Sequence, residues 1–170
     1  NKVFWGGREY SKLSESASGY QSIIPLLLVV YHLNIGGENN SFIIEEPELN
    51  LFPETQKELV KEISSCVWKE HNSLVIATHS PYILSSFSLL LFASQVAYKG
   101  DNVERVKEII PAKSWINPNR FVAYYVANGT CKSIFNEETG LIGENELDEV
   151  SLSIGDEFDR LMEIYREKSA

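Results

Sequence analysis

Acidic and imidazole side chains follow two apolar segments that have the form of buried strands. Glu45 and Glu46 end "SFIIEE", and Thr78 ends "SLVIAT", with His79 directly after it. Parallel strands deliver such residues to one edge of a sheet, where ligands bind. One carboxylate can hold Mg²⁺, a second can activate water for attack on phosphate, and a histidine can hydrogen-bond phosphoryl oxygens. Taken singly, the acids are more typical of a solvated strand end, and His79 of a capped loop histidine. Together, one crossover apart, they favour a functional site.

The length, net charge and cysteine content limit the classes of protein to consider. The length of 170 residues suits one domain with a real core. A net charge of -9 argues against a stand-alone nucleic-acid binder. Cys66 lies on a helical pattern and Cys131 in a strand pattern, which favours a reducing, cytoplasmic location over a disulfide framework. The apolar run from Ile23 to Leu33 is too short to span a membrane, so we expect a buried helix and no membrane partner.

Strand patterns alternate with helix patterns along the chain, which predicts an α/β fold with a parallel sheet and flanking helices. Residues 21–33 predict a helix apolar on all sides, and residues 41–46 a strand covered on both faces. A helix follows from Pro53, a second strand at 73–78, and a helix from Pro81 with Ser80 as N-cap. Residues 94–100 predict a third strand.

The remaining segments predict smaller elements. Residues 1–12, with Gly6 and Gly7, suggest a short strand or hairpin, and Asn128-Gly129 predicts a hairpin turn. Residues 153–168 predict an amphipathic helix with Asp156, Glu157 and Asp159 on a solvated acidic face rather than in a metal cluster, and with a buried stripe of Phe158, Leu161, Met162 and Tyr165. We expect a core domain over residues 1–100 and a small α+β extension over 101–170 that packs on it.

Three segments together resemble one family. "FIIEEPELNLFP" resembles the Walker B segment and D-loop of ABC-class ATPase heads, in the branch with RecF-like and SMC-like proteins and OLD-family ATPase domains. "LVIATHSPYIL" resembles the switch-histidine segment, and "SASGYQS" resembles the signature motif. Their order also agrees, over about Leu13 to Leu84. The resemblance implies the C-terminal lobe of a P-loop ABC-type ATPase head that dimerises around ATP.

The resemblance assigns roles at the sheet edge. Glu45 matches the acid associated with Mg²⁺, and Glu46 matches the catalytic glutamate that polarises the attacking water. His79 matches the switch histidine that senses the γ-phosphate. These three residues are therefore the metal-binding and catalytic candidates.

The resemblance also assigns roles at the subunit interface. Ser18 and Gly19 match signature positions that touch the γ-phosphate of ATP held by the opposite subunit, with Gln21 beginning the helix aimed at it. Asn50 lies in the segment matching the D-loop, which crosses the dimer interface. Tyr20 departs from the pattern, because a second glycine is usual there, and Glu45 stands where ABC transporters have Asp.

A phosphate-binding loop is absent from the sequence, since no G-x-x-x-x-G-K-[ST] occurs among the 170 residues. Without it there is no nest of backbone N–H groups and no lysine for the phosphates. We therefore expect ATP and Mg²⁺ binding to require a further, N-terminal lobe. The start at Asn1 rather than Met suggests the same, that the chain is part of a longer ATPase and inactive alone.

Other functions stay open. By resemblance, the complete protein acts as a homodimer in DNA repair, chromosome handling or anti-phage defence, with DNA or an effector protein as a possible partner. A different class is a stand-alone metal-dependent phosphohydrolase or nuclease that uses Glu45, Glu46, Glu48 and His79. A third is an interaction domain in which this edge has no catalytic role.

Overall fold

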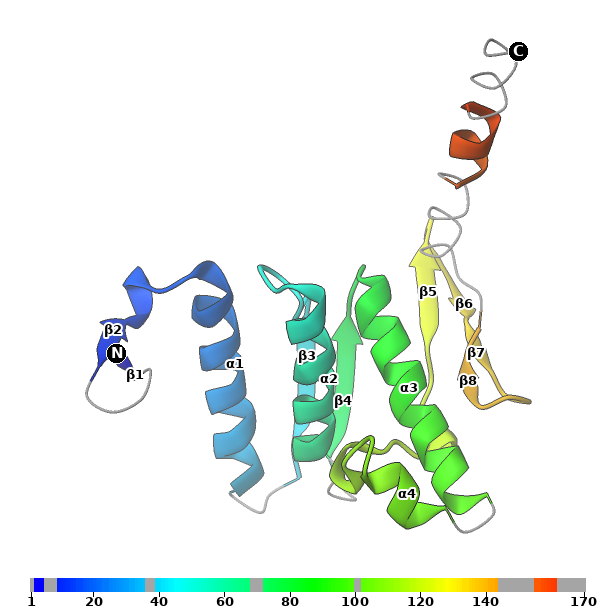
Figure 1. Cartoon of the computed structure of the whole chain (residues 1–170), viewed down its shortest axis with the longest axis horizontal. Coiled ribbons are helices and arrows are strands. Elements are labelled where there is room, and N and C mark those ends of the chain that lie inside the picture. The colour runs from blue at the N-terminus through cyan, green and yellow to red at the C-terminus, as the bar shows by residue number, and fades with distance from the viewer. Residues whose placement is uncertain are drawn as a thin grey trace. The chain divides into compact units, whose positions relative to one another are not determined.

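The computed structural model describes residues 2–4, 9–35, 39–67, 72–99, 102–143 and 155–161. The chain forms two compact units, residues 1–117 and 118–170 (Figure 1). The first unit contains the candidate catalytic residues, and each unit is described by itself below.

A two-stranded parallel sheet organises the first unit. Strand β3 (Ser41–Glu45) pairs with β4 (Ser73–Ala77) in register, from Ser41 opposite Ser73 to Glu45 opposite Ala77. Helix α2 (Pro53–Val67) makes the crossover between them. The predicted strand–helix–strand arrangement is confirmed for this pair. Both strands end at the same edge, so Glu46 and His79, which follow them closely, are delivered to one side of the sheet.

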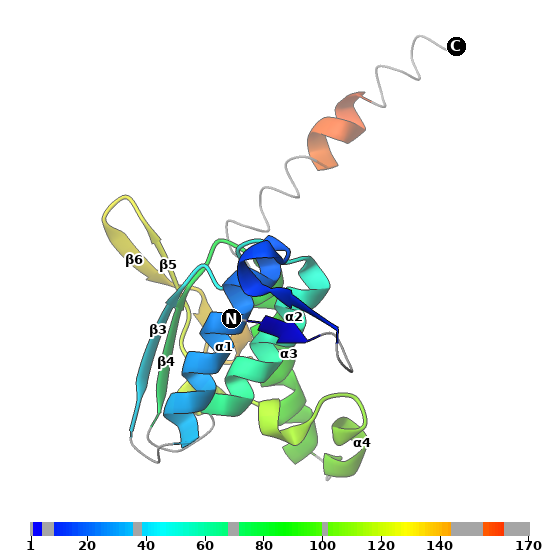
Figure 2. The same cartoon turned by 90° about the vertical axis from the view of Figure 1, so that its left-hand side faces the viewer.

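Helices α1 (Ser18–Ile35), α2 and α3 (Pro81–Tyr98) lie on one side of this sheet (Figure 2). Phe42 and Ile44 point toward α1 and α2, where they join two hydrophobic clusters with Val30, Leu59, Ile63 and Cys66. Successive side chains of a strand point to opposite faces. The other face therefore carries Ile43, which is 77% exposed, and Val75, which is 57% exposed. The expectation of a strand covered on both faces is wrong, because helices cover only one.

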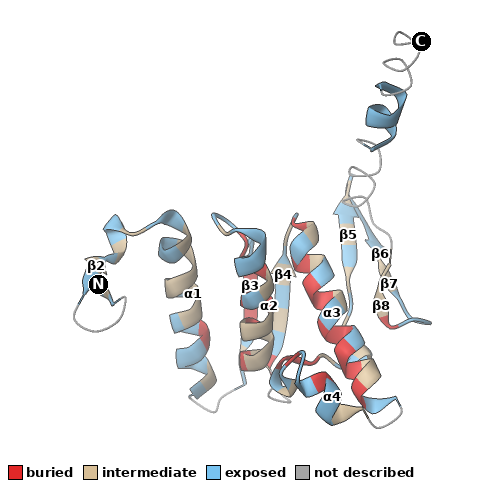
Figure 3. Cartoon of the chain, viewed as in Figure 1, coloured by how far each residue is buried: buried red, intermediate tan, exposed pale blue. Residues whose placement is uncertain are grey.

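Helix α1 begins earlier and is less buried than the sequence predicts. It starts at Ser18 rather than Gln21, and Pro25 lies inside it. Val30 is buried, whereas Leu28, Val29 and Ile35 are exposed (Figure 3). The helix is apolar on all sides in sequence, but only one side contacts α2 and the sheet. The predicted all-round burial is therefore wrong.

Helix α3 (Pro81–Tyr98) replaces the third strand that residues 94–100 predict. Ser94 lies four residues after the buried Leu90, and Ala97 lies three after Ser94, so both continue the buried face of the helix. Burial therefore outweighs the strand preference of the segment. Among the described residues, α3 is the one helix apolar and long enough to cross a membrane, but 44% of it is buried in the protein. Such burial is typical of a core helix.

Smaller elements complete the first unit. Strand β1 (Lys2–Phe4) pairs antiparallel with β2 (Tyr10–Lys12), which confirms the hairpin, although Gly6 and Gly7 lie outside the described residues. The 3₁₀ helix η1 (Leu13–Glu15) leads to α1. After α3 come α4 (Val103–Lys107) and η2 (Ala112–Ser114). The buried indole of Trp115 donates to the carbonyl oxygen of Ile110 at 2.9 Å.

The second unit is built from short strands. After η3 (Pro118–Arg120), β5 (Tyr124–Ala127) pairs with β6 (Thr130–Ser133), and β7 (Phe135–Asn136) pairs with β8 (Leu141–Ile142). Asn128 and Gly129 have φ values of 50° and 73° at the turn. Positive φ at both positions is the hairpin geometry that an Asn-Gly pair favours, so this prediction is confirmed.

The terminal helix is described over residues 155–161. Phe158 and Leu161 are exposed, so the prediction that they form a buried stripe is wrong, and Met162 and Tyr165 lie outside the described residues. The acidic residues of this segment are also exposed, as predicted for a solvated face.

Candidate functional site

Two loops leave the carboxyl edge of the β3–β4 sheet and lie side by side. Residues 46–52 follow β3, and residues 78–80 follow β4. The backbone N–H of Glu46 donates to the carbonyl oxygen of Ala77 at 2.7 Å, which extends the sheet pairing by one residue. Glu46 has a φ of 45°, in the left-handed region that few residues other than glycine adopt. Such strained backbone is concentrated at functional sites.

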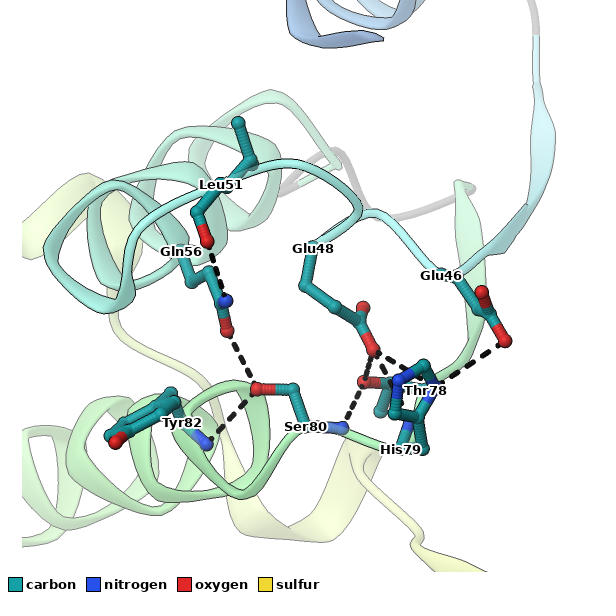
Figure 4. Close-up of polar contacts among 8 residues, drawn as sticks. All are labelled: Glu46, Glu48, Leu51, Gln56, Thr78, His79, Ser80 and Tyr82. Atoms are coloured by element: carbon teal, nitrogen blue, oxygen red, sulfur yellow. Dashed lines mark hydrogen bonds and ion pairs between the residues drawn. The ribbon is translucent and has the colours of Figure 1, made fainter. Parts of the chain in front are cut away.

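Glu46 and His79 face each other across this edge. The Nδ1 atom of His79 lies 3.3 Å from Oε1 of Glu46 (Figure 4). The two side chains are 67% and 46% exposed, His79 the more so, which leaves both accessible to a ligand. The structure thus brings together the two residues that the sequence predicts to be catalytic. A carboxylate can orient a water molecule here, and the imidazole can contact a phosphoryl oxygen.

Glu48 lies beneath this pair and is 6% exposed. Its Oε1 atom accepts a hydrogen bond from the Thr78 hydroxyl at 2.5 Å and one from the backbone N–H of His79 at 3.2 Å (Figure 4). The same atom lies 3.8 Å from Nδ1 of His79. Within the described part of the chain, Oε2 of Glu48 is buried without a hydrogen-bond partner. The sequence analysis named Glu48 only among the residues of the alternative metal-dependent hydrolase and missed these contacts.

A second buried link joins the same two loops. The hydroxyl of Ser80 accepts from the backbone N–H of Tyr82 at 3.2 Å and so caps α3, as predicted. It also donates to Oε1 of Gln56 at 2.6 Å, and Nε2 of Gln56 donates to the carbonyl oxygen of Leu51 at 3.0 Å. Ser80 and Gln56 are both buried. The end of the first loop is therefore tied to the start of α3.

The first turn of α1 contacts the loop after β3. A Cβ atom on Gly19 would lie 2.9 Å from the carbonyl oxygen of Asn50, so only glycine allows this approach. Nδ2 of Asn50 donates to the hydroxyl of Ser22 at 3.3 Å, and Asn50 itself has a φ of 63°. The helix starts at Ser18, so the backbone N–H groups at its N-terminus belong to the predicted signature residues. The signature and D-loop candidates are thus neighbours.

Two other candidates have different surroundings. Nε2 of Gln21 donates to the carbonyl oxygen of Ser16 at 2.7 Å, which braces the turn before α1. Glu45 is the exposed last residue of β3, paired in register with Ala77. No group of three or more His, Cys, Asp or Glu residues able to hold a metal occurs among the residues that the structure describes.

Comparison with known protein families found one match. Residues 3–84 match the family model described as "AAA ATPase domain". The match supports an AAA-type ATPase domain. No match was found among curated proteins or among solved structures.

The AAA ATPase match covers β1 through the first turn of α3. It therefore includes every residue discussed above as catalytic, metal-binding or interfacial, together with both loops at the sheet edge. Nucleotide use, usually with Mg²⁺, is a property of such ATPases. The rest of α3 and the whole second unit lie outside the matched segment.

Proposed function

We propose that this chain is the catalytic C-terminal lobe of an ABC-class ATPase head of the RecF-, SMC- and OLD-like branch. The observation that carries the proposal is the pairing of Glu46 and His79, 3.3 Å apart, at the carboxyl edge of a parallel strand pair. The two residues lie within the segment that matches the AAA ATPase domain family. The coupling of a carboxylate and an imidazole at such an edge suits attack of water on a terminal phosphate.

Each residue has a distinct role in the proposed reaction. Glu46 orients the attacking water and accepts its proton, and its exposed carboxylate leaves room for that water. His79 donates a hydrogen bond to a γ-phosphate oxygen, where negative charge increases in the transition state. The short distance between the two side chains supports this division of roles, because a water held by Glu46 and a phosphate held by His79 would then be neighbours.

Glu45 is the proposed Mg²⁺ ligand. It offers an exposed carboxylate at the end of β3, and proteins commonly hold Mg²⁺ through one or two carboxylates together with substrate phosphates and water. A single carboxylate therefore fits this ion only together with the phosphates of a bound nucleotide and water. Mg²⁺ would neutralise charge on the β- and γ-phosphates and orient them.

The signature segment suggests a site shared between two subunits. Ser18 and Gly19 open α1, and a helix N-terminus binds anions through its free N–H groups. We propose that they contact the γ-phosphate of ATP bound to the other subunit of a homodimer, with Asn50 at the interface. The phosphate-binding loop would come from a further lobe, because the 170 residues contain no such motif. DNA or an effector protein would then be the target that the ATP-driven dimer acts on.

The test is ATP trapping in the complete protein. Glu46→Gln keeps the size of the side chain but removes its basicity, so hydrolysis should fall by about 10²–10⁴-fold while ATP binding persists. We expect this variant to retain ATP and to elute as a dimer in size-exclusion chromatography with light scattering. Glu58→Gln, an exposed residue of α2, is the matched control and should behave as wild type. A Glu46→Gln protein that neither retains ATP nor dimerises with it would overturn the proposal.

A further inference from the structure

We propose that Glu48 is a positioning residue that holds His79 opposite Glu46. Its effect on catalysis rests on the function proposed above, whereas its effect on the geometry of the site does not. Glu48 does not face the open edge where nucleotide would lie, because its side chain is 5% exposed. It acts instead on the backbone that carries His79.

One oxygen atom of Glu48 fixes three consecutive residues. Oε1 accepts from the hydroxyl of Thr78 and from the backbone N–H of His79. The Thr78 hydroxyl in turn accepts from the backbone N–H of Ser80 at 3.0 Å. The whole turn from Thr78 to Ser80 is therefore oriented by a single carboxyl group reaching across from the loop after β3.

The burial of Glu48 indicates a specific role. A buried carboxyl group loses its hydration and stabilises the fold only when hydrogen bonds replace the lost water. Here Oε1 has two donors, but Oε2 has none within the described part of the chain. A shorter apolar residue would satisfy burial without this unpaired oxygen. The arrangement is thus poorly suited to stability alone and well suited to fixing the adjacent turn.

The turn is also held at its other end. Gln56 connects Ser80 to the carbonyl oxygen of Leu51, which lies three residues beyond Glu48 in the same loop. Two links therefore join the loops, one through Glu48 and one through Gln56. The Glu48 link is the one attached directly to His79, so removing it should release the imidazole while α3 stays capped by Ser80.

The geometric test uses nuclear magnetic resonance of the 170-residue chain. In Glu48→Ala, we expect the backbone N–H groups of His79 and Ser80 to exchange with solvent about tenfold faster or more. The His79 N–H group loses its acceptor, and the Thr78 hydroxyl that accepts from Ser80 is no longer held by Glu48. The imidazole resonances of His79 should also shift. In Glu48→Gln, the side-chain carbonyl can still accept both bonds, and exchange should stay within about threefold of wild type. Glu58→Ala and Glu58→Gln are the matched surface controls.

The outcomes are distinct. The proposal is overturned if the His79 resonances and the exchange rates stay at wild-type values in Glu48→Ala. It is also overturned if Glu48→Gln is as perturbed as Glu48→Ala, because that result would mean that the charge of Glu48 matters rather than its hydrogen bonds. If Glu48→Ala does not fold, Thr78→Val removes one of the two bonds and should show the same changes at His79 and Ser80. Unchanged exchange in Thr78→Val would then reject the proposal.

The kinetic test uses the complete protein. Glu48→Ala should lower kcat by about tenfold or more with little change in the KM for ATP, and Glu48→Gln should restore most of kcat. An unchanged kcat in an active protein would contradict the positioning role. Absence of any ATP hydrolysis in the wild type would instead contradict the proposed function and leave the resonance result to decide the geometry.

Discussion

Gly19 and the carbonyl oxygen of Asn50 approach so closely that a Cβ atom would lie 2.9 Å from the oxygen. The contact is backbone to backbone, so no side-chain rotation relieves it. It brings the first turn of α1, the predicted signature segment, against the loop after β3. The relative position of the two segments therefore depends on a residue without a side chain.

Gly19→Ala should destabilise the protein by about 1–3 kcal/mol, because the new methyl group forces the loop away from α1. Helix preference alone predicts the opposite sign, since alanine in a helix is favoured over glycine by up to about 1 kcal/mol. Chemical denaturation measures the difference. Gly155→Ala is the control, because nothing lies within 4 Å of its Cβ position. A neutral or stabilising Gly19→Ala would show that the close contact does not exist.

Adjacent residues of β3 should differ sharply in their effect on stability. Ile44→Ala removes a side chain from the cluster with Leu59 and Ile63 and should cost about 2–5 kcal/mol. Ile43→Ala changes the exposed face of the sheet and should cost less than about 1 kcal/mol in the 170-residue chain. Denaturant midpoints of the two variants provide the measurement. Equal losses would mean that both faces of the strand are covered.

Ser80→Ala should destabilise the protein by about 1–2 kcal/mol, because it removes the cap of α3 and leaves the buried Gln56 without a donor to its Oε1 atom. Ser85→Ala, at an exposed position of the same helix, is the control and should change stability by less than about 0.5 kcal/mol. The unfolding free energies of Ser80→Ala, Gln56→Leu and the variant with both changes measure the coupling between the two side chains. Fully additive effects would argue against the hydrogen bond between the two side chains.

Tyr31 should titrate at unusually high pH. Its hydroxyl donates to Oε1 of Glu62 at 2.5 Å, and this hydrogen bond, with burial and the nearby charge of Glu62, raises the pKa of Tyr31 to about 12. A raised pKa means that the folded state favours the neutral phenol. The resulting contribution to stability is complete below pH 10 and is lost as the pH rises from 10 through 12.

The difference in phenolate absorbance between the wild type and Tyr31→Phe reports the ionisation of Tyr31. This difference should therefore appear near pH 12. In Glu62→Gln, the charge that favours the neutral phenol is absent, and the same difference should move toward pH 10. A wild-type difference that already appears near pH 10 would contradict the hydrogen bond to Glu62.

His79→Asn in the complete protein should reduce ATP hydrolysis by about a hundredfold while ATP binding remains, because the proposed contact to the γ-phosphate strengthens in the transition state. Steady-state kinetics and a nucleotide-binding titration separate the two effects. His32→Asn, at an exposed position of α1, is the control. Undiminished hydrolysis in His79→Asn would remove the histidine from the mechanism.

Local patterns in the sequence predicted much of the site. The apolar runs before Glu45 and Thr78, separated by a helical pattern, predicted a parallel pair and placed Glu46 and His79 at one edge, because parallel strands end on the same side. Asn128-Gly129 predicted its hairpin, since few other pairs adopt positive φ at both positions. Ser80 before Pro81 predicted the start of α3 for a similarly local reason.

The tertiary structure decided what depends on neighbours. The apolar composition of α1 and β3 predicted complete burial, but only packing determines that Leu28 and Ile43 face outward. Burial against the core kept residues 94–98 helical despite their strand preference. Two sets of contacts join residues about thirty positions apart. Gly19 packs against Asn50, and Glu48 accepts hydrogen bonds from Thr78 and His79. The sequence by itself determined which side chains reach the edge of the sheet, because that follows from periodicity and turns, whereas only the folded chain decided which of them touch.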